Sequence, residues 1–222
     1  MSLGERAALE GILAALKPAL AVEIGTAEGG SLRRISEHSS EVHSFDLVAP
    51  AADIAAIGHA SFHAGDSHVL LPAFLAQLAE TRRHVDFVLV DGDHSADGVR
   101  RDAEDLLASA AIEQTVILFH DTANEEVRAG IDAVDFDAHA KVVHVEPDFV
   151  AGSLFSDAEL ENEIWGGLGI VIVDGSRPRS PGSTALQQRI VPTAALLREA
   201  RDRRLGSLDR VQAAVRMRFR GR

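Results

Sequence analysis

Two hydrophobic periodicities alternate along the first 175 residues of the chain. Short apolar runs, such as "FVLV" at 87–90, recur between longer segments in which apolar side chains are spaced three or four residues apart. A continuous apolar run predicts a buried strand, and the longer spacing predicts a helix with one apolar face. The predicted strands cover 20–25, 41–47, 60–67, 85–92, 114–122, 141–146 and 167–175, and the predicted helices cover 5–17, the segment up to about 39, 68–80, 95–109 and 124–135.

Strands that alternate with helices at this spacing indicate βαβ units. They predict an α/β fold with a mostly parallel sheet that is covered by helices on both faces. All seven predicted strands fall within 1–175, so we expect this segment to form one domain. The stretch "DGSRPRSPGST" at 174–184 is rich in Pro, Gly and Ser and predicts a linker at 176–184. Residues 185–222 follow as a predicted helical C-terminal extension.

The composition excludes some kinds of site and compartment. The 222 residues include no Cys, which excludes disulfides and thiolate metal sites. No apolar run is long enough for a membrane span, and the N-terminus lacks the basic segment that precedes the apolar core of a secretory signal. We therefore expect a cytoplasmic protein that does not bind membranes.

The net charge of −12 is unevenly distributed along the chain. Nine of the 22 Lys and Arg residues, but only three of the 34 Asp and Glu residues, lie between Arg198 and the C-terminus, which leaves a strongly acidic body. An acidic body repels phosphates, so we do not expect a nucleic acid to be the substrate. The extension also carries more apolar residues than a lone helical hairpin can bury. We therefore predict that it joins subunits into a homo-oligomer.

Polar residues follow five consecutive predicted strands at the point where each strand ends. In open α/β sheets, ligands bind beyond the carboxyl ends of the strands. One acid in such a place is usually a turn former or a helix cap, but five strand ends in succession predict a binding site. The residues are Glu23 and Gly25, Asp46, Asp66 and Ser67, Asp91 and His94, and His120 and Asp121.

The loop "EIGTAEGG" at 23–30 lacks the G-x-G-x-x-G spacing of a dinucleotide fingerprint. It still makes a close turn into a helix N-terminus, which favours an anionic group. A tight turn without any ligand is the alternative. Asp46 lies 21 residues after Gly25, where a carboxylate commonly accepts hydrogen bonds from a ribose.

Together, "AVEIGTAEGGSL", "FDLV", "AGDS" and "DFVLVDGDH" resemble the class I S-adenosylmethionine (SAM) dependent methyltransferases over about residues 19–175. The resemblance implies their Rossmann-like fold, with seven strands and a reversed edge strand. It also implies that Asp46 binds the ribose of SAM and that Asp66 and Ser67 lie beside the adenine. The residues implied to hold the methionine part of SAM are Glu23, Gly25, Thr26, Gly29, Gly30 and Ser31.

A further resemblance concerns the ends of the fourth and fifth strands, which should be neighbours about 4.8 Å apart. The segment from Asp91 to His94 is similar to a D-x-x-H segment of metal-dependent O-methyltransferases, namely the macrolide sugar O-methyltransferases and the related cephalosporin-hydroxylase-like proteins. It implies that Asp91 and Asp121 bind a divalent metal and that His94 is a general base. Where these enzymes usually carry two acids or an Asp-Asn pair after the fifth strand, this chain has His120 and Asp121, which makes His120 a candidate third ligand. Oxygen ligands favour Mg²⁺, whereas the imidazole of His120 shifts the preference toward Mn²⁺, Fe²⁺ or Zn²⁺.

Two alternatives to this metal site are open. His120 can point away, so that only Asp91 and Asp121 bind the ion. In the other alternative no metal binds: Asp91 and Asp121 cap helices, and His94 bonds to one of them.

The predicted function is transfer of a methyl group from SAM to a hydroxyl oxygen of a small molecule, such as a sugar or another natural product. An oxidoreductase with a nucleotide cofactor is one alternative, which the missing G-x-G-x-x-G disfavours. A non-catalytic SAM-binding protein is another. The stretch 146–167 contains the only Trp, Trp165, and is too long for a plain connection, so it is either a lid over the substrate or a contact between subunits.

Overall fold

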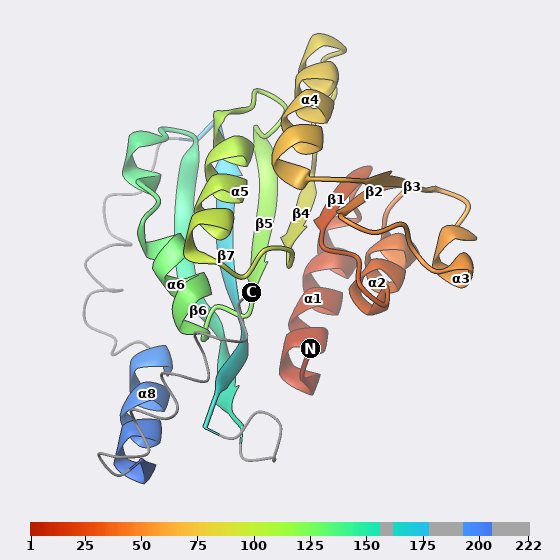
Figure 1. The fold of residues 1–222 in the computed structure, drawn as a ribbon. Coiled ribbons are helices and arrows are strands. Elements are labelled where there is room, and N and C mark those ends of the chain that lie inside the picture. The colour runs from red at the N-terminus through yellow and green to blue at the C-terminus, as the bar shows by residue number, and fades with distance from the viewer. Residues whose placement is uncertain (156–161, 178–192, 206–222) are drawn as a thin grey trace.

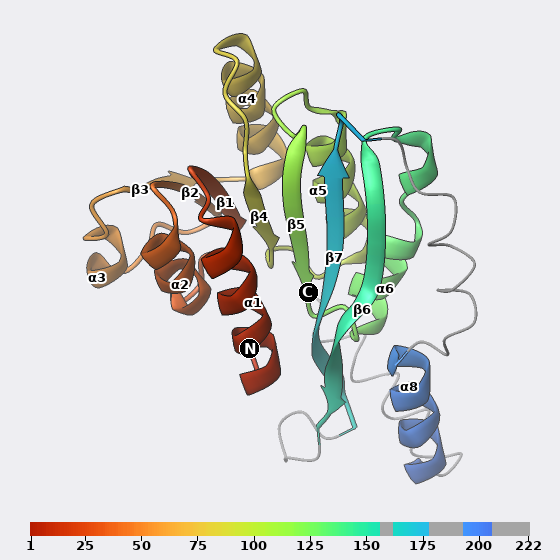
Figure 2. The same cartoon turned by 180° about the vertical axis from the view of Figure 1, so that it is seen from behind.

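A computed structural model describes residues 1–155, 162–177 and 193–205 of the chain. These residues form a seven-stranded sheet between two layers of helices (Figure 1 and Figure 2). The strands are β1 (Leu20–Ile24), β2 (Glu41–Asp46), β3 (Ala60–Ala64), β4 (Phe87–Val90), β5 (Gln114–His120), β6 (Val142–Leu154) and β7 (Ile164–Asp174). The helices are α1 (Leu3–Leu16), α2 (Gly30–His38), α3 (Ala52–Ala55), α4 (Ser67–Glu80), α5 (Ala96–Ala108), α6 (Glu125–Asp132), the 3₁₀ turn η1 (Phe136–Ala138) and α8 (Thr193–Arg204).

The strand order β3-β2-β1-β4-β5-β7-β6 confirms the predicted fold class. The first five strands pair in parallel, and β7 runs antiparallel to both β5 and β6. The predicted reversed strand is thus β7, which lies one place inside the edge strand β6. Ile24, Val90 and Phe119 are in register across β1, β4 and β5. The residues that follow these three strands therefore meet at one edge of the sheet.

The hydrophobic core lies in two layers, one on each face of the sheet. On one face, β-strand side chains pack against α4, α5 and α6, for example through Leu75 and Leu106. On the other face, they pack against α1 and α2, for example through Leu13 and Ile35. Figure 1 and Figure 2 show these two sets of helices on opposite sides of the sheet. Coverage of both faces explains why the central strands are continuously apolar rather than alternating.

The predicted sixth strand, 141–146, is too short. β6 continues to Leu154 and forms a long antiparallel ribbon with β7. Pro147 predicts the end of a strand, because proline has no backbone N–H to donate. β6 is an edge strand with a register shift between Glu146 and Val150, so the missing N–H of Pro147 is tolerated there. Much of the predicted connection at 146–167 is therefore strand, and residues 156–161 of it lie outside the described part of the chain.

Part of the predicted C-terminal extension is described. α8 packs against β6 of its own chain, whereas the predicted linker from 178 and the helical segments at 185–192 and 206–222 lie outside the described residues. A homo-oligomer formed through this extension stays a prediction. Among the described residues, no helix is both long and apolar enough to cross a bilayer.

Candidate active site

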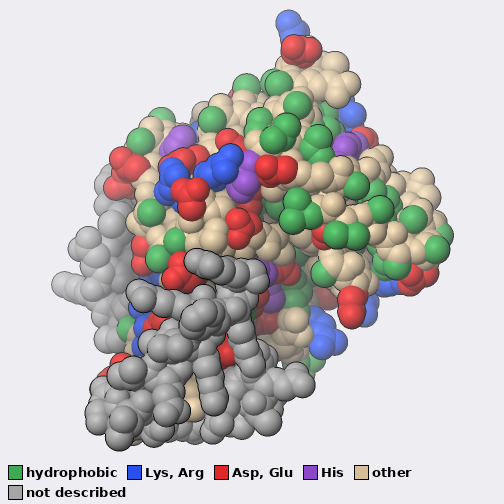
Figure 3. All heavy atoms as spheres, in the orientation of Figure 1, with side chains coloured by type: hydrophobic (Ala, Val, Ile, Leu, Met, Phe, Trp, Pro, Cys, Tyr) green, Lys and Arg blue, Asp and Glu red, His purple; other side chains and the backbone are tan. Residues whose placement is uncertain are grey.

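A cavity of about 1010 Å³ opens at the carboxyl ends of the parallel strands. Gly25, Asp46 and Ser67, which follow β1, β2 and β3, line one side of it. His94, after β4, and Trp165, on β7, line the other side. Figure 3 shows acidic and histidine side chains close together in the middle of this face. The cavity therefore has a glycine-containing side and a side rich in titratable groups.

The β1–α2 turn requires glycine because the backbone is both left-handed and crowded. Gly25 has φ +90°, and a Cβ atom at this position would lie 2.1 Å from the carbonyl oxygen of Asp91. Gly29 has φ +71° and a Cβ would lie 2.4 Å from Ile54. Gly29 is also the N-cap of α2, and no side chain bonds to the first N–H groups of that helix. The turn thus passes close to the end of β4 at Gly25 and close to α3 at Gly29, where a side chain would not fit.

Asp46 at the end of β2 holds this turn in place. Its Oδ2 accepts hydrogen bonds from the backbone N–H groups of Thr26 (2.8 Å) and Ala27 (3.0 Å), and its Oδ1 accepts one from Val48 (3.0 Å). Burial alone would raise the pKa of Asp46, but these N–H donors outweigh it and lower the pKa. The carboxylate therefore stays ionised at the cavity wall.

Glu23 lies beneath the turn. Its side chain is fully buried in β1, where it accepts hydrogen bonds from the hydroxyls of Ser31 (2.6 Å) and Ser44 (3.0 Å). Burial, followed by the charges of Asp91 and Asp46, raises the pKa of Glu23 to about 8. This carboxyl group ties α2 and β2 to β1 from below the cavity.

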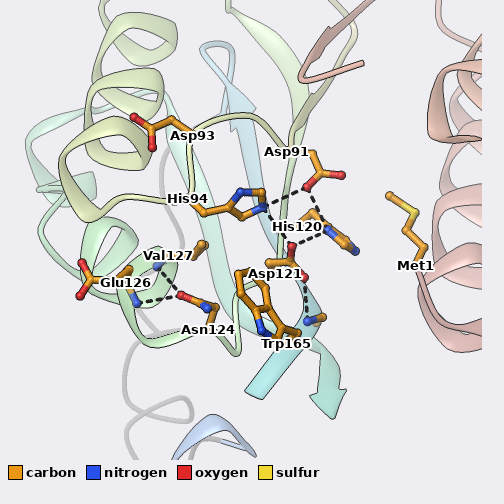
Figure 4. A network of polar contacts seen from close by, with 12 residues as sticks. Met1, Asp91, Asp93, His94, His120, Asp121, Asn124, Glu126, Val127 and Trp165 are labelled. Carbon is orange, nitrogen blue, oxygen red and sulfur yellow. Dashed lines mark hydrogen bonds and ion pairs between the residues drawn. The ribbon is translucent and has the colours of Figure 1, made fainter. Parts of the chain in front are cut away.

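Two carboxylates and two imidazoles converge after β4 and β5 (Figure 4). His94 Nε2 lies 3.0 Å from Asp121 Oδ2 and 3.5 Å from Asp91 Oδ1. His120 Nδ1 lies 3.0 Å from Asp91 Oδ1 and 3.3 Å from Asp121 Oδ2. The candidate ligand atoms of Asp91, His94 and Asp121 all lie within 4.8 Å of one another. Such a mixed oxygen and nitrogen set has the chemistry of a divalent-metal site.

The N-terminal helix reaches this cluster through Glu5. Glu5 is 2% exposed, its Oε1 accepts the N–H of Gly167 at 2.6 Å, and its Oε2 lies 3.4 Å from Nε2 of His120. Burial alone would raise the pKa of Glu5, but His120 and the Gly167 N–H outweigh it and lower the pKa to about 2. A buried carboxylate therefore orients the side of the His120 ring that faces away from Asp91 and Asp121.

The charges of the cluster stabilise one another. Asp121 and then Asp91 raise the pKa of His94 to about 9. Burial lowers the pKa of His120, but contacts with Asp121, Asp91 and Glu5 outweigh it and raise the pKa to about 11. Burial raises the pKa of Asp121, but contacts with both rings and the Gly166 N–H bring it well below its usual range. In the protein alone, the positive charges of the two imidazoles thus balance the negative charges of the carboxylates. A bound cation would also supply positive charge at this place.

A family model described as a methyltransferase domain matches residues 22–122 of the chain. This match covers a little under half of the chain. No curated protein matches the sequence. Three solved structures are similar to the fold. The first is an O-methyltransferase from Bacillus cereus in complex with SAH, with 15% identity over 78% of this chain and 82% of that chain and a TM-score of 0.53. The second is the O-methyltransferase TomG from Streptomyces achromogenes in complex with SAM, with 14% identity over 79% of this chain and 82% of that chain and a TM-score of 0.53. The third is a putative hemolysin from Streptococcus thermophilus, with 11% identity over 88% of this chain and 71% of that chain and a TM-score of 0.58.

At these identities the solved structures show a shared fold, and the family match over residues 22–122 agrees with the predicted resemblance to methyltransferases. The predicted cofactor residues fall into two groups. Gly25, Asp46, Asp66 and Ser67 line the cavity, and Asp66 also caps α4 through its side chain. The others are not among the residues that line it in the described structure: Glu23, Thr26, Gly29, Gly30 and Ser31.

The predicted metal residues do come together, and His120 points toward Asp91 and Asp121 rather than away. In the alternative without a metal, the capping part is wrong, because Ser95 caps α5 and Asn124 caps α6. The bond that this alternative expects from His94 to one of the two carboxylates is present, to Asp121. His94 lines the cavity with Asp91, whereas His120 is 8% exposed and sits behind them.

Sequence reasoning missed three residues around the cavity. Glu5 belongs to a Ser2-x-x-Glu5 capping box, a pattern that normally signals only a helix start. His68 lines the cavity, and its Nδ1 lies 3.3 Å from the fully buried carboxylate of Asp102. Arg201 of α8 also lines it. No local sequence signal distinguishes these residues, because each acts through a partner far away in the chain.

Proposed function

We propose that the protein transfers the methyl group of SAM to a hydroxyl oxygen of a small molecule, with a divalent cation held by Asp91, Asp121 and His120 and with His94 as the base. One observation carries the proposal. Two carboxylates and two imidazoles converge at one end of the cavity whose other end begins at the glycine turn. A volume of about 1010 Å³ matches the upper end of ordinary ligand pockets, which supports room for a cofactor and a small acceptor together.

The glycine turn supports the cofactor part of the proposal. Gly25 and Gly29 keep side chains out of the turn, and the turn lines the cavity at Gly25 and Ala27. Asp46 lies at the cavity wall as an ionised acceptor for ribose hydroxyls. The neighbours solved with SAM or SAH share this fold.

The donor set supports the cation. Asp91, Asp121 and His120 would hold it from the protein side, and a bound divalent cation would stabilise the acceptor oxygen as its proton leaves. Their mixture of oxygen and nitrogen admits Mn²⁺ as well as the Mg²⁺ that oxygen ligands favour. His94 faces the cavity with Nε2 toward the same carboxylates, so it is placed to take the proton of the acceptor.

The base needs a free lone pair on Nε2 of His94. The charges of Asp121 and Asp91 raise the pKa of His94 to about 9, which keeps the ring protonated at neutral pH. Neutralisation of those two carboxylates removes the cause of this rise, and the pKa returns toward the ordinary value of about 6.5. The proposed roles of the cation and of His94 are therefore linked.

The direct test is calorimetric titration with SAM, SAH and NAD, each with and without Mg²⁺ or Mn²⁺, followed by mass spectrometry of a panel of sugars and phenols incubated with SAM. We expect SAM and SAH to bind and NAD not to bind. Tighter binding of NAD would favour the oxidoreductase alternative. Binding of SAM without methylation of any compound by the cation-loaded protein would favour the non-catalytic alternative.

Replacement of Asp46 by Ala is expected to weaken SAM binding. Asp46 presents a charged acceptor to the cavity and also holds two N–H groups of the glycine turn, and loss of such a partner costs about 1.5–3 kcal/mol. Calorimetry should therefore show SAM affinity reduced by roughly 10- to 150-fold. Asp53→Ala is a matched control, because Asp53 is exposed and pairs only with Arg33 on the surface. Equal SAM affinity in both variants would remove Asp46 from the cofactor site.

Replacement of Glu5 by Gln is expected to weaken cation binding. Gln keeps the size of the side chain and the capping box, but it loses the charge that orients His120. Loss of such an outer partner typically reduces metal affinity by about 10- to 100-fold, which a Mn²⁺ titration followed by electron paramagnetic resonance would measure. Ser2→Ala is the control: it removes the cap of α1, with a loss of about 1 kcal/mol in stability, and should leave Mn²⁺ affinity unchanged. The opposite pattern would make Glu5 a capping residue only.

A further inference from the structure

The C-terminal helix contributes a side chain to the cavity. α8 packs against β6, and Arg201 and Leu205 at its end are 9% and 8% exposed. Arg201 lines the same cavity as His94 and Trp165. In Figure 1, α8 lies below α6 and beside the lower part of β6. The part of the extension that the structure describes thus borders the cavity of its own chain.

An ion pair connects this helix to the strand-end region. Nη2 of Arg201 donates to Oε1 of Glu125 at 2.8 Å, and Nε of Arg201 lies 3.5 Å from Asp202. Glu125 is the first residue of α6, four positions after Asp121. Surface ion pairs contribute little to stability, but this guanidinium is largely buried and joins two separate elements. The pair therefore positions α8 relative to the loop that carries Asp121.

The cavity side that contains Arg201 is the one left for the acceptor. The opposite side has the glycine turn and the residues after β2 and β3, which suit the cofactor. Trp165 adds an aromatic ring to the acceptor side, and its indole Nε1 donates to Glu163 at 2.8 Å. The ring lies edge-on to His94, with 5.7 Å between the ring centres. An acceptor that reaches His94 would therefore meet Trp165 in a cavity that Arg201 and Glu125 also line.

We propose that α8 forms a wall of the acceptor site and that Arg201, held by Glu125, is a specificity-determining residue for the acceptor. This inference rests on the proposed function. A planar guanidinium and an indole ring that line one cavity suit an acceptor with a flat or apolar face and with oxygen atoms that accept hydrogen bonds. The same contacts assign the described part of the extension to the active site of its own chain, in addition to any role in assembly.

The protein contains its own reporter for this wall, because Trp165 is the only Trp in the chain. Its fluorescence can be quenched by acrylamide, which is neutral, by iodide, which is an anion, and by caesium, which is a cation. A charge within about one Debye length of the ring, roughly 10 Å at 0.1 M salt, changes the local concentration of an ionic quencher. The ratio of caesium to iodide quenching therefore reads the charge of the wall around Trp165 without any need for an identified acceptor.

The experiment compares Arg201→Ala, Glu125→Ala and Arg203→Ala with the full-length protein at low ionic strength. We expect Arg201→Ala to increase acrylamide quenching and to raise the caesium-to-iodide ratio by about twofold, and Glu125→Ala to lower that ratio. Arg203 is the matched control on the same helix: it is exposed and pairs with Glu199 of α8, so its removal should change neither quantity. SAM affinity should be the same in all variants, because these residues lie on the acceptor side.

Unchanged quenching in both Arg201→Ala and Glu125→Ala would overturn the wall, and a comparable change in Arg203→Ala would show that the effect is not specific to Arg201. Arg201→Lys keeps the charge and should restore the caesium-to-iodide ratio, which separates loss of charge from loss of folding. The proposed function fails separately. If the protein does not bind SAM but shows the expected quenching pattern, α8 is still supported as a wall of the cavity, and the proposed methyl transfer from SAM is contradicted.

Discussion

Gly25→Ala is expected to abolish SAM binding and to destabilise the domain by roughly 3 kcal/mol or more, the combined scale of backbone strain and overpacking. Gly25 has φ +90°, which a residue with a Cβ atom adopts only with strain. The new Cβ would lie 2.1 Å from the carbonyl oxygen of Asp91 and 2.9 Å from Cα of Gly92. The backbone cannot move aside easily, because the N–H of Asp91 donates to the carbonyl oxygen of Ile24 at 2.8 Å.

The same substitution at Gly11 is the control for this prediction. Gly11 lies in α1, and nothing is within 4 Å of the position of an added Cβ. Gly11→Ala should therefore raise the free energy of unfolding by about 0.5–1 kcal/mol through helix propensity and leave SAM affinity unchanged. Denaturant unfolding and calorimetric titration of both variants give the comparison. Native stability and native SAM affinity in Gly25→Ala would show that the glycine turn is not constrained as described.

Asp121→Asn is expected to reduce Mn²⁺ affinity by at least about tenfold and methyl transfer by a similar or larger factor, because it removes one ligand charge. The change also turns Oδ2, which faces both imidazoles, into an NH₂ group, but it is conservative for the backbone. Asp121 has φ +56°, a conformation that Asn tolerates well, and the Oδ1 that accepts the Gly166 N–H at 2.7 Å has a counterpart in the amide oxygen of Asn. The backbone should therefore stay in place while the charge is lost.

Asp97→Asn is a suitable control for the loss of one carboxylate, since Asp97 is exposed on α5 and pairs with Arg100. Paramagnetic resonance of Mn²⁺ and the rate of methyl transfer, with and without chelator, measure the outcome. Equal Mn²⁺ affinity in Asp121→Asn and Asp97→Asn would remove Asp121 from the cation site. Failure of the unaltered protein to bind Mn²⁺ or Mg²⁺ would contradict the cation site. The positive charges of His94 and His120 alone would then balance the negative charges of Asp91 and Asp121.

The sequence alone determined the sheet and the edge at which the site forms. Strands such as β4 are marked by continuous apolar runs, and their ends by polar residues and Gly, so local periodicity was enough to place them. Consecutive strands joined by one helix are usually neighbours, and this is why Asp91 and His120 could be predicted to meet. The length of β6 escaped prediction, because Pro147 is compatible with a strand only at the edge that the finished sheet provides.

The tertiary structure alone decided which side chains face the cavity. A strand buried on both faces carries no polar face in its sequence, so nothing indicated that Glu23 lies beneath the glycine turn. Glu5 and His120 are 115 positions apart, and Arg201 and Glu125 are 76 apart. Such pairs form only when helices pack on a completed sheet, and the free energy that selects them comes from burial and charge compensation. The periodicity of a short segment gives no information on burial or charge compensation between elements that are far apart in the chain.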